Sequence, residues 1–204
     1  GDKILCESNL YGCTVRLFEE VFKKFGIKIF YSDFTKNTYV KEIININPSL
    51  IWLESPTNPL LKILNIKDIC NAAKKKNIPV VVDNTFNTAL IQKPLELGAT
   101  MSLISTTKFI NGHSDALGGA VLTNEKKWHD KLNFAQKSLG LHPSPFDCWL
   151  ITRGLKTFPL RIEQQTTSAG IIAREISSHK LISQLIYPFN LNHPQYELAK
   201  NQMR

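Results

Sequence analysis

The sequence has 204 residues, of which 43% are hydrophobic and 21% charged, and its formal net charge is +8. This composition is typical of a globular protein with a sizeable core, and it excludes a disordered or fibrous chain. The basic residues are scattered, and their one tight run, Lys74-Lys75-Lys76, ends an expected helix, where cations complement the helix dipole. Because no known nucleic-acid-binding module accompanies the charge, we expect no nucleic-acid partner.

Short apolar runs alternate with longer amphipathic segments in the first part of the chain. Strands are expected at residues 3–8, 27–34, 49–55, 78–84, 100–106 and 116–124. Helices are expected at residues 14–26, 39–47, 66–77 and 128–140. This alternation predicts an α/β fold with a mostly parallel sheet flanked by helices on both sides. The unbroken apolar run of 78–84 indicates a strand buried on both faces.

The pattern becomes helical from about residue 125. Pro159 lies inside a long helical stretch and should kink or divide it. A short apolar piece at 181–187 and a helix-like segment to Arg204 follow. We expect three parts, listed in chain order: part of a large domain at 1–145, a long connecting helical segment at 146–179 and the start of a small C-terminal domain at 180–204. The chain begins almost directly in a strand, without Met, and ends in mid-helix, so we expect truncation at both ends.

The cysteines point to a reduced, cytoplasmic protein. The four cysteines are widely spaced and form no CxxC pair, which argues against a zinc site and a disulfide-dense secreted scaffold.

No apolar run approaches the ~18 residues of a membrane span, and the first residues lack the pattern of a signal peptide, so we expect no membrane partner. Trp52, Trp128 and Trp149 are interpreted as packing residues.

Polar side chains follow three of the expected strands, at the edge where open α/β sheets bind ligands. These are Asn58, Asp83 and Lys108. Asp83 ends a buried apolar run, and because a lone buried carboxylate is costly, it needs a protein or ligand partner. Taken alone, Asp83 also fits a capping or turn aspartate, and Asn58 fits a turn residue between two prolines.

Lys108, with hydroxyls around it, points to pyridoxal phosphate. This cofactor needs a lysine amine for a Schiff base, a carboxylate that keeps its pyridine nitrogen protonated, and hydrogen-bond donors around its phosphate. Lys108, Asp83 and the hydroxyls of Ser105 and Thr107 match these needs. The alternative for the two hydroxyls is a turn that closes the strand. Together, the four residues favour the cofactor.

Seven motifs, in order and with family-like spacing, resemble the Cys/Met-metabolism pyridoxal-phosphate enzymes. They are YGCT (11–14), ESPTNP (54–59), VVVDNTF (80–86), PLELGA (94–99), STTKFINGHSD (105–115), PSPFDCWLITRGLKT (143–157) and HPQYELAKNQM (193–203). This family contains cystathionine γ-lyase, cystathionine γ-synthase, cystathionine β-lyase and methionine γ-lyase. The resemblance implies the PLP-dependent transferase fold of type I, which is aspartate-aminotransferase-like, and makes residues 1–145 part of its PLP-binding domain.

The resemblance also implies a role for each matching residue. Lys108 matches the Schiff-base lysine, which also moves protons, and Asp83 matches the partner of the pyridine nitrogen. Ser105 and Thr107 match phosphate ligands. Tyr11 matches a tyrosine that stacks on the cofactor ring near the leaving group, although on its own it also fits a packing aromatic at a helix start.

Further positions of the resemblance concern the ring hydroxyl and the loop after the lysine. Asn58 matches an amide near the ring hydroxyl of the cofactor. His113 and Asp115 are expected to fix the loop after Lys108 by hydrogen bonds, and we expect no metal site there. The family's glycine-containing phosphate loop and its substrate-carboxylate arginine fall outside this chain.

The resemblance implies an amino-acid substrate and two closely ranked reactions. SLGLHPSPFDCWLITRGLKT and HPQYELAKNQM look most like γ-lyase, which favours γ-elimination of cystathionine to cysteine, 2-oxobutanoate and ammonia. ESPTNPLLK and YGCTVRLFEE are at least as close to γ-synthase, in which cysteine replaces the acyl group of an O-acylhomoserine. Cys13 resembles the cysteine found at this position in methionine γ-lyases. Methionine γ-lyase and a non-catalytic fragment are the two lower-ranked alternatives. The family's shared active sites imply a homotetramer, a dimer of dimers.

Overall fold

The computed structural model describes residues 1–203, so Arg204, the last residue of the expected closing segment, lies outside the described part. The chain forms two compact units. Unit 1 comprises Gly1–Asn84 and Lys93–Ser102, and unit 2 comprises Thr85–Gln92 and the chain from Leu103 onward. Over the described residues, no helix combines the length and apolar character that a bilayer crossing requires. The domain boundaries expected from the sequence stay a prediction.

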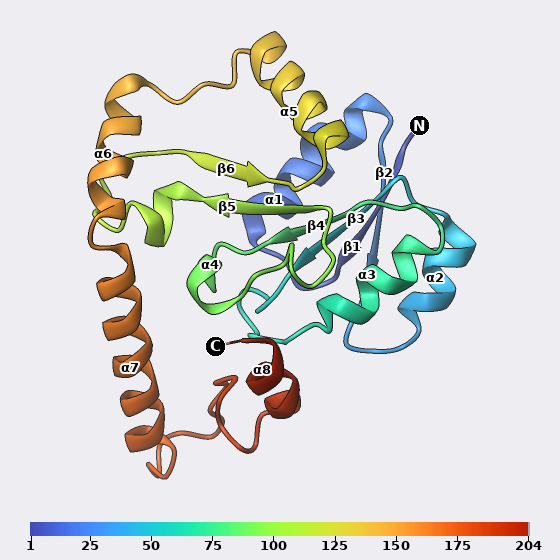
Figure 1. The fold of residues 1–204 in the computed structure, drawn as a ribbon. Helices are drawn as coiled ribbons and strands as arrows, with labels where there is room; N and C mark the ends of the chain where they lie inside the picture. The colour runs from blue at the N-terminus through green and yellow to red at the C-terminus, as the bar shows by residue number, and fades with distance from the viewer. Residues whose placement is uncertain (204) are drawn as a thin grey trace. The chain divides into compact units, whose positions relative to one another are not determined.

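The strands of residues 1–203 form a six-stranded sheet in the order β2-β1-β3-β4-β5-β6 (Figure 1). They are β1 (Lys3–Glu7), β2 (Lys28–Ser32), β3 (Leu50–Glu54), β4 (Val80–Asp83), β5 (Met101–Ser105) and β6 (Gly119–Leu122). In unit 1, β1 pairs in parallel with β2 and β3, and β3 pairs in parallel with β4. Each strand lies within the segment expected from the sequence. The predicted α/β fold with a mostly parallel sheet is therefore confirmed.

The two faces of the unit 1 strands are covered by different helices. On one face, β1, β3 and β4 pack against α2 (Tyr39–Ile46) and α3 (Ile66–Lys74), with alternate apolar side chains buried. On the other face, Cys6 and its register neighbour Trp52 pack with Phe18. β4 is buried along its three valines, as its unbroken apolar sequence predicts. Helix α3 ends at Lys74, so the basic run does lie at a helix C-terminus.

The segment after β1, expected as one helix over 14–26, consists of three short helical pieces. They are α1 (Gly12–Arg16), the π-helix η1 (Leu17–Val21) and the 3-10 helix η2 (Phe22–Phe25). Phe18 is buried edge-on against Trp52 and stacks on Phe22, with ring centroids 5.3 and 5.8 Å apart. The two phenylalanines are four residues apart and pack together on the side of the sheet.

Unit 2 is mainly helical, as the sequence predicts beyond residue 125. Its helices are α4 (Thr88–Ile91), the π-helix η3 (Thr106–Ile110), α5 (Lys126–Leu139), α6 (Pro145–Leu155), α7 (Phe158–Ile176) and α8 (Tyr196–Gln202). The expected long segment is divided as predicted. Helix α6 ends at Leu155, and α7 begins at Phe158 with Pro159 in its first turn, where the missing N–H of proline is tolerated. The packing role expected for Trp149 is wrong, since its side chain is 59% exposed on α6, whereas Trp52 does pack.

Candidate functional site

The carboxyl ends of the unit 1 strands carry three of the predicted site residues. Asp83 is the last residue of β4 and is half-buried. Tyr11 follows β1 at the start of α1 and is 40% exposed. Asn58 lies in the exposed turn after β3, and its peptide bond to Pro59 is cis. Because the strands β1, β3 and β4 are parallel, their carboxyl ends share one edge, so unit 1 presents a phenol, an amide and a carboxyl there.

Glu54, at the end of β3, connects two of these residues. Its carboxylate Oε2 accepts a hydrogen bond from the backbone N–H of Tyr11 at 2.8 Å. It is also the register neighbour of Asp83, so both side chains lie on the same face of the sheet. Glu54 is 6% exposed, and this burial is the main reason that its pKa is raised to about 7. The negative charge of Asp83 also raises the pKa of Glu54, whereas the hydrogen bond from the Tyr11 N–H lowers it.

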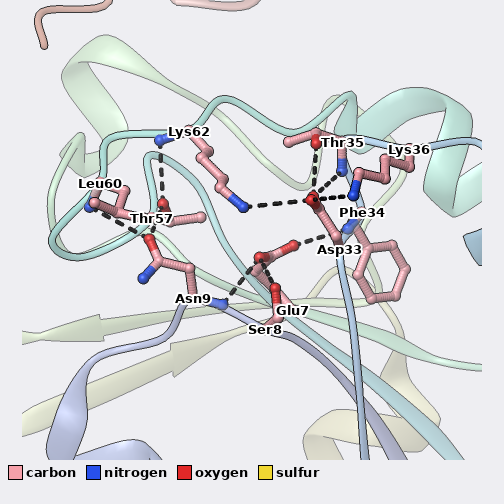
Figure 2. A network of polar contacts seen from close by, with 10 residues as sticks. All are labelled: Glu7, Ser8, Asn9, Asp33, Phe34, Thr35, Lys36, Thr57, Leu60 and Lys62. Carbon is pink, nitrogen blue, oxygen red and sulfur yellow. Dashed lines mark hydrogen bonds and ion pairs between the residues drawn. The ribbon is translucent and has the colours of Figure 1, made fainter.

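A second buried glutamate, Glu7 at the end of β1, ties the neighbouring loops together. Its Oε1 accepts from the Ser8 hydroxyl and the Asn9 N–H, both at 2.9 Å, and its Oε2 accepts from the Phe34 N–H at 2.9 Å. The carboxylate is thus satisfied by donors from the loops after β1 and β2. Figure 2 shows this arrangement.

Asn9 extends the network from the Tyr11 loop to the Asn58 loop. Its Oδ1 accepts from the Thr57 hydroxyl at 2.6 Å and from the Leu60 N–H at 3.3 Å (Figure 2). Thr57 Oγ1 in turn accepts from the Lys62 N–H at 3.1 Å. The segments that carry Tyr11 and Asn58 are therefore held to each other by a side chain between them.

The phenol of Tyr11 has its own local environment. A side-chain hydrogen bond with Cys13, the residue that departs from the family pattern, raises the pKa of Tyr11, and the negative charge of Glu54 acts in the same direction. The Arg16 charge lowers it. Tyr11 begins α1 without a side-chain cap, so Glu54 and the first turn of the helix fix its backbone.

Unit 2 carries the other predicted residues at the end of β5 and in η3. Lys108 lies inside η3, where its φ of −87° and ψ of −119° interrupt the helical backbone. The side chain is exposed, and with residues 1–203 it makes no hydrogen bond or ion pair. The amine of Lys108 is therefore available to a ligand, while its carbonyl oxygen accepts the Gly112 N–H at 2.8 Å.

The two flanking hydroxyls differ in their availability. The backbone N–H of Ser105 donates to Thr85 Oγ1 at 2.8 Å, and the Ser105 hydroxyl makes no hydrogen bond within the described residues. The hydroxyl oxygen of Thr107 accepts a hydrogen bond from the Gly118 N–H at 2.9 Å, and the Thr107 O–H donates to the Gly118 carbonyl at 3.2 Å. The Ser105 hydroxyl is thus available to donate to an anionic ligand. The Thr107 hydroxyl could donate to such a ligand only after its bond to the Gly118 carbonyl is broken.

The loop after Lys108 is fixed by hydrogen bonds of the residues expected to do so. His113 Nδ1 lies 2.6 Å from the carbonyl oxygen of Asn111, so this nitrogen carries the hydrogen. Asp115 accepts from Asn111 Nδ2 at 2.8 Å and from Arg153 Nη2 at 2.7 Å. The loop-fixing prediction is confirmed. Across residues 1–203 no group of three or more His, Cys, Asp or Glu side chains is arranged to hold a metal ion.

Two residues near these sites were missed by the sequence reasoning. Glu54 had the same signal as Asp83, a carboxylate that ends an apolar strand, and could have been found by the same argument. Arg161 had no such signal, because it lies in α7, far along the chain from the residues whose carbonyls it binds.

The fold and the polar strand ends define a class of protein, an α/β protein with a mostly parallel sheet and polar side chains beyond the carboxyl ends of its strands, where sheets of this kind bind ligands. A family model, described as Cys/Met metabolism PLP-dependent enzyme, matches residues 1–204. The chain belongs to this family. Its fold is the type I fold of PLP-dependent enzymes, as expected from the seven motifs.

Known proteins of this family are similar over the whole chain. The chain is 43% identical over 204 residues to a probable cystathionine gamma-synthase of Herpetosiphon aurantiacus, covering 100% of this chain and 64% of that protein. It is 43% identical over 203 residues to cystathionine gamma-lyase of Rattus norvegicus, covering 99% and 51%. The crystal structure of cystathionine gamma-lyase from Lactobacillus plantarum complexed with L-serine is 35% identical, with a TM-score of 0.97 and coverage of 100% and 54%. The chain thus spans about half to two thirds of the length of these proteins.

The side chains present fit the cofactor that the family uses. Unit 2 offers an exposed amine without a protein partner at Lys108 and an unengaged hydroxyl at Ser105. Unit 1 offers the half-buried carboxyl of Asp83 and the exposed ring of Tyr11, which lie at the same edge of its parallel strands. An amine, an acid, a hydroxyl donor and an aromatic face are the groups that pyridoxal phosphate needs from a protein.

Proposed function

We propose that the chain is part of an enzyme that uses pyridoxal 5'-phosphate to eliminate the γ-substituent of cystathionine, giving cysteine, 2-oxobutanoate and ammonia. The observation that carries the proposal is the exposed amine of Lys108, which has no partner within residues 1–203 although the backbone around it is hydrogen-bonded. An amine held on a fixed backbone and left free is suited to bind a carbonyl ligand covalently. The family membership supports this use.

Lys108 and Asp83 have the central roles in the proposal. Lys108 would hold the cofactor through Nζ until the amine of the substrate takes its place. Nζ would then be available to take the α-proton of the substrate and to move the β-proton, which allows the γ-substituent to leave. When bound, the cofactor supplies a ring that accepts the electron pair left at the α-carbon. Asp83 keeps a hydrogen on the pyridine nitrogen, which makes the ring a better acceptor.

The other predicted residues bind and orient. The Ser105 hydroxyl donates to the phosphate, and Thr107 joins it when it releases the Gly118 carbonyl. Tyr11 packs its ring against the cofactor and holds its phenol hydrogen near the leaving group. Its raised pKa keeps that hydrogen in place at neutral pH. Asn58 directs its amide toward the ring hydroxyl.

The second candidate reaction is γ-replacement, in which cysteine displaces the acyl group of an O-acylhomoserine. The sequence identities support this candidate, because the probable γ-synthase of Herpetosiphon aurantiacus and the rat γ-lyase are both 43% identical to the chain. The residues that bind the cofactor serve both reactions equally. The lyase ranks first because residues 138–157 and 193–203 look most like those of γ-lyases. Methionine γ-elimination ranks third, on Cys13 alone.

For the whole protein we propose a cytoplasmic homotetramer, a dimer of dimers, that acts on small amino acids and binds neither nucleic acid nor membrane. This part of the proposal depends on the family relationship and on the scattered positive charge. The division into a PLP-binding domain, a connecting segment and a C-terminal domain belongs to it as well.

The test is a titration of the chain with pyridoxal phosphate, followed by the visible absorbance of the lysine-bound cofactor. The complex is then reduced with borohydride, and the labelled lysine is identified by peptide mass spectrometry. We expect the label on Lys108 and its absence in Lys108→Ala. Lys137→Ala, which removes an exposed lysine of α5, is the matched control and should be labelled as the wild type is.

The outcomes separate the proposal from its alternatives. A label on another lysine, or equal absorbance in Lys108→Ala and the wild type, refutes the assignment of Lys108. No cofactor absorbance at all identifies a non-catalytic fragment. Product analysis with cystathionine alone, and with O-acylhomoserine plus cysteine, distinguishes lyase from synthase by 2-oxobutanoate in the first mixture or cystathionine in the second.

A further inference from the structure

The backbone on the N-terminal side of Lys108 is held by Thr85, which binds the Ser105 N–H, and by Gly118, which binds the next two residues. The Gly118 carbonyl accepts the N–H groups of Thr106 and Thr107 at 3.0 and 3.3 Å. The Gly118 N–H donates to Thr107 Oγ1 at 2.9 Å. The backbone N–H groups just before Lys108 therefore have hydrogen-bond partners that do not involve α7.

On the C-terminal side, the carbonyl groups need partners, because the end of a helix leaves its last carbonyls without intrahelical donors. The carbonyl of Lys108 accepts the Gly112 N–H, and that of Asn111 is bound by His113. The two carbonyls between them belong to Phe109 and Ile110. Neither is satisfied by the loop itself, and both are bound by one side chain from α7.

That side chain is Arg161. Its Nη1 donates to the Phe109 carbonyl at 2.8 Å, and its Nη2 donates to the Ile110 carbonyl at 3.1 Å. Nη2 also donates to the carbonyl of Gly154 in α6 at 2.9 Å, and Nε donates to Thr157 Oγ1 at 3.1 Å. One planar guanidinium thus joins η3 to the junction of α6 and α7, a set of bonds that a lysine cannot reproduce.

Two glycines make room for this contact. Gly112 has a φ of +73°, and a methyl group there would overlap the guanidinium of Arg161. At Gly154 a methyl group would overlap the carbonyl of Asn111. The absence of side chains at these two positions lets the loop after Lys108 lie directly against α6 and the Arg161 side chain.

We propose that Arg161 is a positioning residue for Lys108, whose guanidinium fixes the backbone of the amine by binding the two carbonyls that follow it. The inference rests on the proposed function, since Lys108 needs a fixed position only if its amine reacts. The ψ of −119° at Lys108 interrupts the helical backbone, and the Lys108 carbonyl is held through the Gly112 and Asn111 N–H groups of the loop that follows. Arg161 adds a constraint from α7 by binding the next two carbonyls of that loop.

The first experiment measures the backbone directly and needs no cofactor. Hydrogen exchange of the full chain, followed by mass spectrometry of peptides within 106–115, reports the protection of the Gly112 N–H. In Arg161→Gln, which keeps one donor, exchange in this segment should rise about tenfold because charged hydrogen bonds are lost. Arg161→Lys should fall between Arg161→Gln and the wild type, and it serves if Arg161→Gln does not fold.

The second experiment follows the amine. The rate at which borohydride fixes pyridoxal phosphate on Lys108 should fall about tenfold in Arg161→Gln, because the amine spends less time in its reactive position. The pH midpoint of the absorbance of the lysine-bound cofactor should shift with it. Two controls accompany both experiments. Arg174→Gln removes a similar charge from the last turn of α7, and Ile162→Ala destabilises α7 through its buried face while keeping the Arg161 guanidinium.

We expect Arg161→Gln to raise hydrogen exchange in 106–115 and to slow the borohydride fixation of pyridoxal phosphate on Lys108. Neither control variant should show these two changes. Unchanged exchange in 106–115, or the same changes in Ile162→Ala, overturns the inference, because the role of Arg161 would then be general stability. Failure of the proposed function looks different. In that case the wild type is labelled away from Lys108 or not at all, while the exchange experiment still decides the role of Arg161 in holding the loop.

Discussion

Replacing Glu54 by Gln should stabilise the protein at alkaline pH and leave it unchanged in acid. Folding buries this carboxyl and raises its pKa from 4.5 to about 7. A carboxyl with a raised pKa binds its proton more tightly in the folded state, so stability falls as pH rises from 4.5 through about 7. Each pH unit corresponds to about 1.36 kcal/mol, so the ionised carboxyl costs the folded state about 3 kcal/mol above pH 8. Glutamine avoids this cost and keeps an oxygen for the Tyr11 N–H.

The assay is urea denaturation of the wild type and Glu54→Gln at a series of pH values from 5 to 9. The difference between their free energies of unfolding should grow through the neutral range and reach about 3 kcal/mol in favour of the variant. Glu20→Gln, which neutralises an exposed glutamate of the same unit, is the matched control and should show no such trend. A Glu54→Gln curve that runs parallel to the wild type across this range would refute the reasoning that burial raises the pKa of Glu54.

Two further predictions concern packing and the cysteines. Gly154→Ala should destabilise the protein by about 1–3 kcal/mol in urea, because its methyl group overlaps the Asn111 carbonyl. Gly12→Ala, whose methyl group meets no atom within 4 Å, should be neutral or slightly stabilising, and equal effects of the two would contradict the close approach at Gly154. Native alkylation with iodoacetamide should label the exposed Cys13 and Cys148 and spare Cys6 and Cys70, whose burial raises the pKa of each to about 12. Mass spectrometry showing label on Cys70 before unfolding would contradict its burial.

The strands were predictable because each is a local apolar run that ends at a turn. The division of the helical stretch at Pro159 was predictable for an equally local reason, the missing amide hydrogen. The three helical pieces at 12–25 were not, because the width of their turns depends on how Phe18 meets Trp52, a residue on another strand. Local pattern determined which elements form, and tertiary contacts determined their detailed geometry.

The candidate site divides in the same way. Asp83 and Lys108 were found because each follows an apolar strand, where a charged side chain stands out. The hydrogen bond from Tyr11 to Glu54 joins residues 43 apart in the sequence, and that from Arg161 to Phe109 joins residues 52 apart. No periodicity within one segment encodes such pairs. Residues predicted to bear the chemistry could therefore be picked out from the sequence, whereas the residues that hold their backbone in place became visible only in the structure.

The network around Glu7 and Asn9 limits how this edge of unit 1 can change. The loops after β1, β2 and β3 are joined there by hydrogen bonds to two side chains, Glu7 and Asn9. Lengthening any one of these loops would therefore leave buried acceptor oxygens without their donors. The surface at this edge is consequently easier to change by exchanging individual side chains, such as the exposed Cys13, than by inserting or deleting residues. Loop length at this edge should therefore vary less than side-chain identity.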